Sequence, residues 1–260
     1  MKNRRFLSLF FCIVLIFTLG TSALASEGDT GDWEVAAKAA LLADPDTGEI
    51  LYARNIHERL YPASLTKVMT ALVALDHASL TDEVVVDHAA ATVGESSANL
   101  REGDRLTMEA ALRGLLIASG NDAAMAIATT VGAKINPEST DPYATFVQAM
   151  NDKAAELGMA SAFTNPHGLD FNGWEADMHS SARDVAVMFA KAMKNDDFRA
   201  ITASTDNKIS VTGADGTQRE ITLQMHNDLL GKDGTSPVKI EVDAPQQHPD
   251  AVGIWRKIVY

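Results

Sequence analysis

Cysteine, aromatic residues and positive charge are all scarce in this chain. Its 260 residues include one cysteine and 6% aromatic residues, and its formal net charge is −13. An acidic balance of this size argues against a nucleic-acid partner. The cysteine, Cys12, lies in the N-terminal apolar run, so a chain without that run has no disulfide and no thiol chemistry. No set of metal ligands has a recognisable spacing, and we expect neither a metal nor a cofactor.

Apolar runs long enough to span a membrane are also lacking. Residues 6–19 are apolar apart from two positions, follow three basic residues, and precede a small-x-small sequence at residues 23–25. This order is typical of a secretory signal peptide. A transmembrane anchor is the alternative, but the run is shorter than the roughly 20 residues that a span needs. We therefore predict that residues 1–25 are removed and that the protein is exported to the cell-wall side of the membrane.

Removing this segment takes away three positive charges, which moves the formal net charge from −13 to −16. The remainder contains no basic amphipathic helix that would hold it on an anionic membrane. We therefore expect no membrane anchor after cleavage.

The remaining residues carry helical and strand patterns in a definite order. The expected domain covers residues 26–235, and residues 236–260 form a divergent tail. Apolar spacings of three and four predict helices, while alternating or β-branched runs predict strands. The predicted helices are 62–75, 108–118, 122–131, 143–157 and 181–193, and the predicted strands are 39–44, 49–54, 83–86, 208–211 and 220–225. This order favours an α+β fold, with an antiparallel sheet from both chain ends and a helical middle region.

Ser64 and Lys67 are the first candidates for chemistry. A serine hydroxyl is a weak nucleophile until a base removes its proton. A neutral lysine can be that base, and burial beside other cations lowers its pKa towards neutrality. A spacing of three places the two side chains on one helix face, close to a helix N-terminus that favours developing negative charge.

The Ser-x-x-Lys pattern alone is weak, because it also occurs at residues 236–239. No apolar helix follows that second copy. A helix-capping serine beside a surface lysine is the ordinary alternative for the first copy as well. The decision therefore depends on the surrounding sequence.

Residues 61–70 closely resemble the nucleophile segment of the serine D-alanyl-D-alanine carboxypeptidases, the low-molecular-mass penicillin-binding proteins of peptidase family S11. Residues 117–124 resemble the second motif of this family, Ser-x-Asn, at Ser119 and Asn121. The tripeptide at residues 97–99 fits the bare pattern too, but the position after an apolar helix favours Ser119. The likeness extends in order over residues 36–230, through the opening hairpin and the segments 163–170, 181–184 and 227–230.

The resemblance implies a β-lactamase/transpeptidase-like fold and an acyl-enzyme mechanism. Ser64 would attack the carbonyl between the two terminal D-alanines of a peptidoglycan stem peptide, with Lys67 as base. Ser119 would relay a proton to or from the leaving amine, and Asn121 would position Lys67 and the substrate amide. β-Lactams would acylate the same serine as inhibitors. His167, in a polar turn, is expected to have no catalytic role.

The third motif of this family, Lys-Thr-Gly, occurs nowhere in the chain. Its lysine would neutralise the substrate carboxylate, and its strand would supply an oxyanion-hole N–H worth about 2.7–4 kcal/mol of the barrier. Residues 238–242 alternate like a strand, and Lys232 or Lys239 offers a poor substitute charge. The loss of likeness after Gly231 suggests a truncated or frame-shifted product.

Two other functions stay open at this point. One is a catalytically impaired protein that binds peptidoglycan or penicillin, which the absent Lys-Thr-Gly motif favours. The other is a β-lactamase of related fold. Ser-Gly-Asn at residues 119–121 and the stretch 165–170 favour the carboxypeptidase instead.

Overall fold

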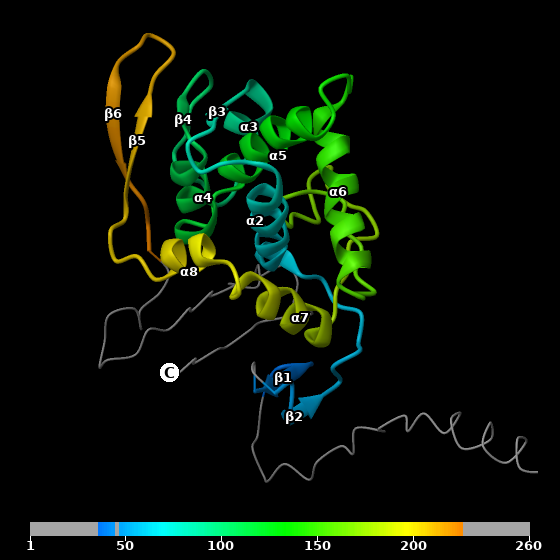
Figure 1. The fold of residues 1–260 in the computed structure, drawn as a ribbon. Helices are drawn as coiled ribbons and strands as arrows, with labels where there is room; N and C mark the ends of the chain where they lie inside the picture. Colours follow the sequence, from blue (N-terminus) through cyan, green and yellow to red (C-terminus); the bar gives the residue numbers. More distant parts are fainter. Residues whose placement is uncertain (1–35, 45–46, 226–260) are drawn as a thin grey trace, which may run out of the picture.

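A computed structural model describes residues 36–44 and 47–225. The predicted signal peptide and the predicted tail 236–260 therefore lie outside the described residues, as does the second Ser-x-x-Lys. Figure 1 shows the arrangement of the elements. In chain order they are β1 (Ala40–Ala43), β2 (Ile50–Arg54), η1 (Ala63–Leu65), α2 (Thr66–His77), β3 (Glu83–Val85), α3 (His88–Thr92), β4 (Arg105–Thr107), α4 (Met108–Ile117), α5 (Asn121–Ile135), α6 (Pro142–Glu156), α7 (Ala182–Ala192), α8 (Asp196–Thr202), β5 (Lys208–Thr212) and β6 (Gln218–Thr222).

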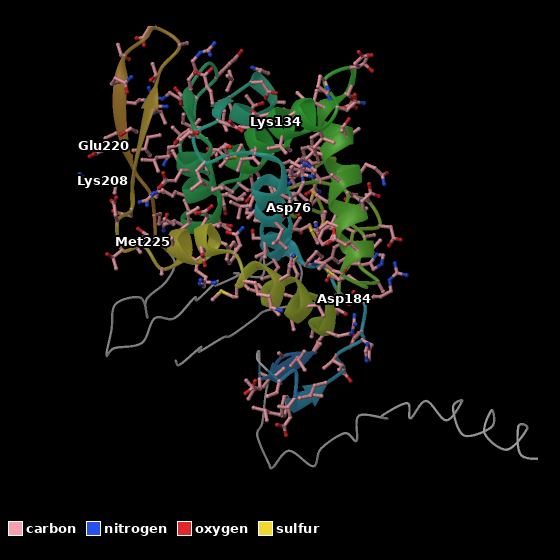
Figure 2. All side chains as sticks on the ribbon, in the orientation of Figure 1. Asp76, Lys134, Asp184, Lys208, Glu220 and Met225 are labelled. Atoms are coloured by element: carbon pink, nitrogen blue, oxygen red, sulfur yellow. The ribbon has the colours of Figure 1, made fainter. Side chains whose placement is uncertain are left out.

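Helix α2 lies at the centre of the helical region. Every residue from Thr66 to Ala74 is buried, so this helix has no face turned to water and has to be enclosed by others. It packs against α4, α5, α6 and α7, and Figure 2 shows side chains filling the space between these helices. Helix α5 is rich in buried alanine, and these small side chains let it approach its neighbours closely.

The strands form two antiparallel sheets. One is the β1–β2 hairpin, and the other has the order β3-β4-β5-β6. The expected mixed fold with a helical middle region is confirmed. Among the described strands, β1–β2 and β5–β6 lie in different sheets; in Figure 1 the first lies below α7 and the second beside α4.

The physical reason for this difference lies in β4 and β5. The inward residues of β5, Ile209 and Val211, are buried, and this strand packs against α4 while pairing with β4 through Arg105 and Thr212. Strand β4 has three residues, which is too short for an alternating pattern to reveal, so sequence reasoning missed the partner that β5 takes.

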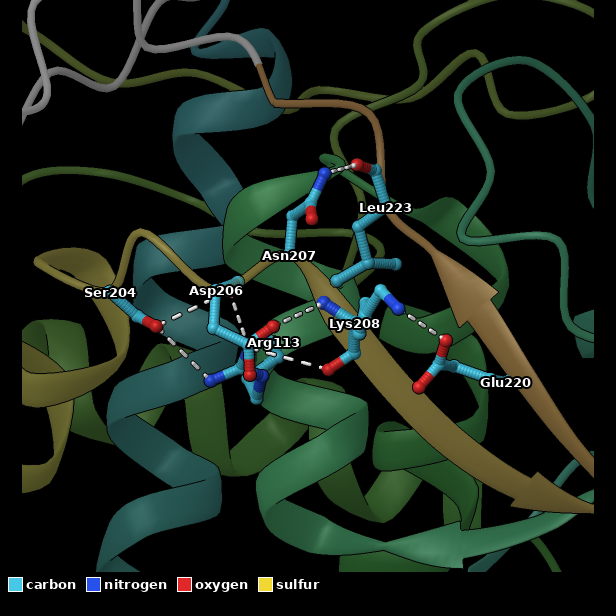
Figure 3. Close-up of polar contacts among 7 residues, drawn as sticks. All are labelled: Arg113, Ser204, Asp206, Asn207, Lys208, Glu220 and Leu223. Carbon is cyan, nitrogen blue, oxygen red and sulfur yellow. Dashed lines mark hydrogen bonds and ion pairs between the residues drawn. The ribbon is translucent and has the colours of Figure 1, made fainter.

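Arg113 on α4 fixes the start of β5, as Figure 3 shows. Its guanidinium donates to the hydroxyl of Ser204 at 3.3 Å and to the backbone carbonyls of Asp206 and Lys208. The side chain of Lys208 in turn pairs with Glu220 of β6 at 2.7 Å. The late hairpin is therefore attached to the helical region by one largely buried cation. Within the described part of the chain, no helix is both long and apolar enough to cross a membrane.

Candidate active site

Ser64 lies in η1, the single 3-10 turn that leads directly into α2. Pro62 precedes this turn, and its fixed φ suits the start of a helix. The preceding residue, Ala63, has a φ of +46°, a conformation that L-residues rarely adopt. The turn therefore holds the partly buried hydroxyl of Ser64 in one place at the start of a buried helix.

Lys67, one turn later, points back to this serine. Its Nζ donates to the Oγ of Ser64 at 3.0 Å and to the backbone carbonyl of His167 at 2.8 Å. The residue is only 2% exposed. The spacing of three therefore brings the two side chains into hydrogen-bonding contact, as predicted.

Burial lowers the pKa of Lys67 to about 7, and the charge of the Asp122 carboxylate partly opposes this effect. Near neutral pH Lys67 therefore has a neutral form that is able to accept a proton. Neighbouring cations were expected to contribute, but burial is the main cause. The adjacent imidazole of His167 is itself neutral at pH 7, because burial and the charge of Lys67 lower its pKa to about 3.

The loop 163–170 covers this pair from one side. The side-chain oxygen of Asn165 accepts from the backbone N–H groups of His167 and Gly168, at 3.2 and 2.7 Å. The hydroxyl of Thr70 on α2 donates to the carbonyl of Pro166 at 2.6 Å. These bonds fix the loop on α2 and hold in place the His167 carbonyl, which accepts a hydrogen bond from Lys67.

Gly168 makes the closest approach of this loop to the serine turn. Its φ is +92°, and a Cβ at this position would lie 1.9 Å from the carbonyl oxygen of Ala63 and 3.1 Å from the nitrogen of Ser64. Only glycine fits both the backbone conformation and the space. This close approach explains why the family-like stretch 163–170 has a glycine at position 168.

His167 acts on Lys67 through its backbone. Its imidazole ring stacks edge-on against Trp174 with the centroids 4.5 Å apart, and its Nδ1 accepts from the N–H of Leu169. The Nε2 atom has no hydrogen-bond partner in the described part of the chain. No hydrogen bond joins the imidazole to Ser64 or Lys67 among these residues.

The second motif occupies the sharp turn between α4 and α5. Ser119 has a φ of +53° and is partly buried, and Asn121 is 2% exposed. The amide Nδ2 of Asn121 donates to the carbonyl of Gly94 at 3.0 Å, and its backbone N–H donates to the carbonyl of Ser96 at 2.8 Å. Its Oδ1 is buried and has no partner among the described residues.

Among the described residues, neither Ser119 nor Asn121 forms a hydrogen bond with Ser64 or Lys67. The expected positioning of Lys67 by Asn121 is therefore not a direct bond here. The connection runs instead through Asp122, whose charge acts on Lys67. Sequence reasoning gave Asp122 no role, although it directly follows the motif.

The other sequence candidates lie elsewhere. Residues 97–99, the second Ser-x-Asn match, form a loop against the α4–α5 turn rather than a second site. Lys232, Lys239 and the strand-like stretch 238–242 lie outside the described residues. The described part of the chain contains no group of three acidic, histidine or cysteine side chains that would hold a metal ion.

Comparison with known proteins agrees with this geometry. Bacillus subtilis D-alanyl-D-alanine carboxypeptidase DacF is 36% identical over 212 residues, which cover 78% of this chain and 51% of the relative. Mycobacterium tuberculosis DacB2 is 39% identical over 168 residues, covering 64% and 54%. The chain thus spans about half the length of these curated relatives.

Solved structures give the same result. The Streptomyces K15 DD-transpeptidase has a TM-score of 0.70 at 29% identity, covering 78% of both chains. A D-alanyl-D-alanine carboxypeptidase from M. tuberculosis H37Rv has a TM-score of 0.65 at 33% identity, covering 78% of this chain and 71% of that one. The family model described as D-alanyl-D-alanine carboxypeptidase matches residues 24–239. The chain therefore belongs to the D-alanyl-D-alanine carboxypeptidase family, peptidase S11.

Proposed function

We propose that this protein is a serine D-Ala-D-Ala carboxypeptidase that removes the terminal D-alanine from peptidoglycan stem peptides. The observation that carries the proposal is the 3.0 Å hydrogen bond from the Nζ of Lys67 to the Oγ of Ser64. It joins a serine at the start of a helix to a buried lysine with a pKa of about 7. This combination activates a serine at neutral pH.

The reaction proceeds in two steps. Neutral Lys67 accepts the hydroxyl proton of Ser64 while Oγ attacks the carbonyl carbon between the two D-alanines. The C–N bond then breaks, D-alanine leaves after its amine receives a proton through Ser119, and an ester forms on Ser64. Water hydrolyses the ester and returns the proton to Oγ.

Asn121 is proposed to bind the substrate amide. Its Nδ2 is committed to the carbonyl of Gly94, whereas its buried Oδ1 is unpaired among the described residues. An unpaired buried acceptor costs about 1–3 kcal/mol, and a substrate N–H would relieve that cost. We propose further that the chain is exported after removal of residues 1–25 and that β-lactams acylate Ser64.

A catalytically impaired penicillin-binding protein is the second candidate. The specific observation in its favour is the absence of Lys-Thr-Gly from all 260 residues. Without that lysine the carboxylate of a peptide or of a penicillin loses its counter-charge, so such a protein would be acylated slowly and would not turn over.

One experiment separates the two functions. Purified protein is incubated with a fluorescent penicillin and with a peptide ending in D-Ala-D-Ala, alongside Ser64→Ala. Ser236→Ala, in the second Ser-x-x-Lys, is the matched control and is expected to behave like the unsubstituted protein. Labelling with D-alanine release, both lost in Ser64→Ala alone, supports the carboxypeptidase. Labelling without release supports the impaired protein, and the absence of labelling contradicts both.

A further inference from the structure

Asp122 is a buried carboxylate that the reaction above does not use. It is 2% exposed and stands in the first turn of α5, directly after the second motif. Its oxygens accept from the hydroxyl of Ser97 at 2.6 Å and from the backbone N–H groups of Ala98 and Leu100 at 2.9 and 3.0 Å. A single side chain therefore binds the first two residues of the tripeptide that duplicates the Ser-x-Asn pattern, and the residue that follows it.

The loop 94–100 fits tightly against the motif turn. Ala98 is fully buried. A Cβ on Gly120 would lie 2.6 Å from the Oδ1 of Asp122 and 2.9 Å from the nitrogen of Ala98. Gly120, in the middle of the motif, is thus pressed between the carboxylate and the loop. The same loop supplies the carbonyls of Gly94 and Ser96 that bind Asn121.

The residues that follow the loop are held by an ion pair. Asp104, 1% exposed, accepts from the backbone N–H of Arg101 at 2.7 Å and pairs with Arg219 of β6. The loop and the residues that follow it are therefore both anchored, but only the Asp122 anchor contacts the motif.

We propose that Asp122 is a positioning residue for the reaction: it clamps the loop 94–100 onto the Ser-Gly-Asn turn and thereby sets where Ser119 and Asn121 stand relative to Lys67. The tripeptide at residues 97–99 then supports the Ser-Gly-Asn motif structurally and is not a second catalytic motif. This inference rests on the proposed function, because it concerns the same site.

Asp122 also carries the charge that acts on Lys67 from α5. From the loop 163–170, His167 faces the same lysine with a neutral imidazole. On the side of α6, Lys153 pairs with Asp76 in the C-terminal half of α2 at 2.7 Å. Among the described groups, Asp122 is therefore the one carboxylate whose removal should move the titration of Lys67.

The test compares three variants. Asp122→Asn removes the charge and weakens the clamp. Ser97→Ala removes one clamp bond and keeps the charge. Asp184→Asn is the matched control, because Asp184 is 2% exposed, stands in the first turn of α7 and binds Ala160 and Ser161; Figure 2 shows it near the β1–β2 hairpin.

The first measurement is the titration of Lys67 by NMR of protein labelled at the lysine ε-carbon, with the signal assigned by its loss in Lys67→Met. The second is hydrogen exchange at the backbone N–H of Asn121, which donates to the carbonyl of Ser96. Asp122→Asn should lower the Lys67 midpoint by about one pH unit. Ser97→Ala should leave the midpoint in place and speed Asn121 exchange about five-fold, the equivalent of one hydrogen bond. Asp184→Asn should change neither.

An unchanged Lys67 midpoint in Asp122→Asn overturns the electrostatic part of the proposal. Unchanged Asn121 exchange in Ser97→Ala overturns the clamp, and it does so even if Asp122→Asn fails to fold. Neither measurement needs turnover, so a protein that releases no D-alanine refutes the proposed function without deciding this inference. In an active protein, penicillin acylation should also shift its pH midpoint downwards in Asp122→Asn.

Discussion

Two segments of the candidate site are built differently. The nucleophile wall consists of η1, α2 and the loop 163–170, and its polar groups bond mostly to one another. The motif wall consists of residues 119–122 and the loop 94–100. It is held by Asp122 and backbone carbonyls, and within residues 36–44 and 47–225 the Oδ1 of Asn121 has no partner.

This difference shows which part of the site each wall supplies. The hydrogen bonds of the base-nucleophile pair all come from the nucleophile wall, and the motif wall acts on the pair through the charge of Asp122. The motif wall is held in position by backbone packing, and its acceptor Asn121 Oδ1 has no partner in the described part of the chain. We therefore expect substitutions in the first wall to act on stability and chemistry together, and substitutions at Asn121 to act on chemistry with little effect on stability.

The largest effect is expected for Gly168→Ala in the nucleophile wall. The new Cβ would overlap the Ala63 carbonyl at 1.9 Å, so the loop and the serine turn have to separate. We expect a loss of more than about 4 kcal/mol of unfolding free energy and no acylation of Ser64. Chemical denaturation and penicillin labelling measure these effects.

Gly173→Ala is the matched control for this prediction. Gly173 has a φ of +93°, nearly the same as Gly168, but a Cβ there would meet nothing within 4 Å. Gly173→Ala should lower the unfolding free energy by only about 1 kcal/mol, through backbone strain. Equal losses in the two variants would show that backbone conformation, and not the contact with the serine turn, controls the nucleophile wall.

Lys67→Met should stabilise the protein while abolishing acylation. The lowered pKa of Lys67 corresponds to roughly 4 kcal/mol of lost folding free energy at pH 7. In the variant the His167 carbonyl loses its hydrogen-bond donor, which costs about 2 kcal/mol. The net gain in unfolding free energy is therefore about 2 kcal/mol.

The pH dependence of this gain has a definite sign. Above pH 7 the folded protein has released the Lys67 proton while the unfolded chain still holds it, so the unsubstituted protein gains stability as pH rises. The advantage of Lys67→Met should therefore be full below pH 7 and shrink towards pH 10. Thermal unfolding at pH 6 and pH 9 measures it, and an advantage that grows with pH contradicts the buried, neutral lysine.

The smallest effect on stability is expected for Asn121→Ala in the motif wall. The substitution loses the bond to Gly94 but also removes the unpaired Oδ1, so unfolding free energy should change by less than about 1 kcal/mol. Acylation should fall by roughly 10²-fold, as for the loss of one substrate-orienting group. Denaturant titration and stopped-flow labelling give the two values.

Asn165→Ala in the nucleophile wall is its matched control. Asn165 is equally buried, at 1% exposed, but its amide accepts two bonds and donates one to the carbonyl of Leu169. Asn165→Ala should lower the unfolding free energy by at least about 2 kcal/mol. If the two asparagines cost the same, the contrast between the walls does not hold.

Much of the fold could be predicted from the sequence where a pattern repeats. The helices α2, α4, α5, α6 and α7 show apolar residues at spacings of three and four, and in the structure Thr107 and Ser181 cap α4 and α7 by accepting from backbone N–H groups. Helices α3 and α8 were missed, because five and seven residues give too few turns for a periodic pattern.

The site could be predicted only as far as residue types reveal it. Ser64 and Lys67 are close in sequence, and one helical turn brings them together. The third contact of that pair is the backbone carbonyl of His167, and a carbonyl is present at every position, so no residue type marks it. The role of Asp122 was hidden for a related reason: its partners in the loop 94–100 lie more than 20 residues away in sequence, and two of those three are backbone groups.

The pH dependence of Ser64 acylation tests the central claim most directly. The rate of penicillin labelling is measured from pH 5 to pH 9, with the adduct located by mass spectrometry. Because neutral Lys67 is the proposed base, the rate should rise with pH through a single midpoint near 7. A rate independent of pH over this range, or an adduct on a residue other than Ser64, would contradict the account.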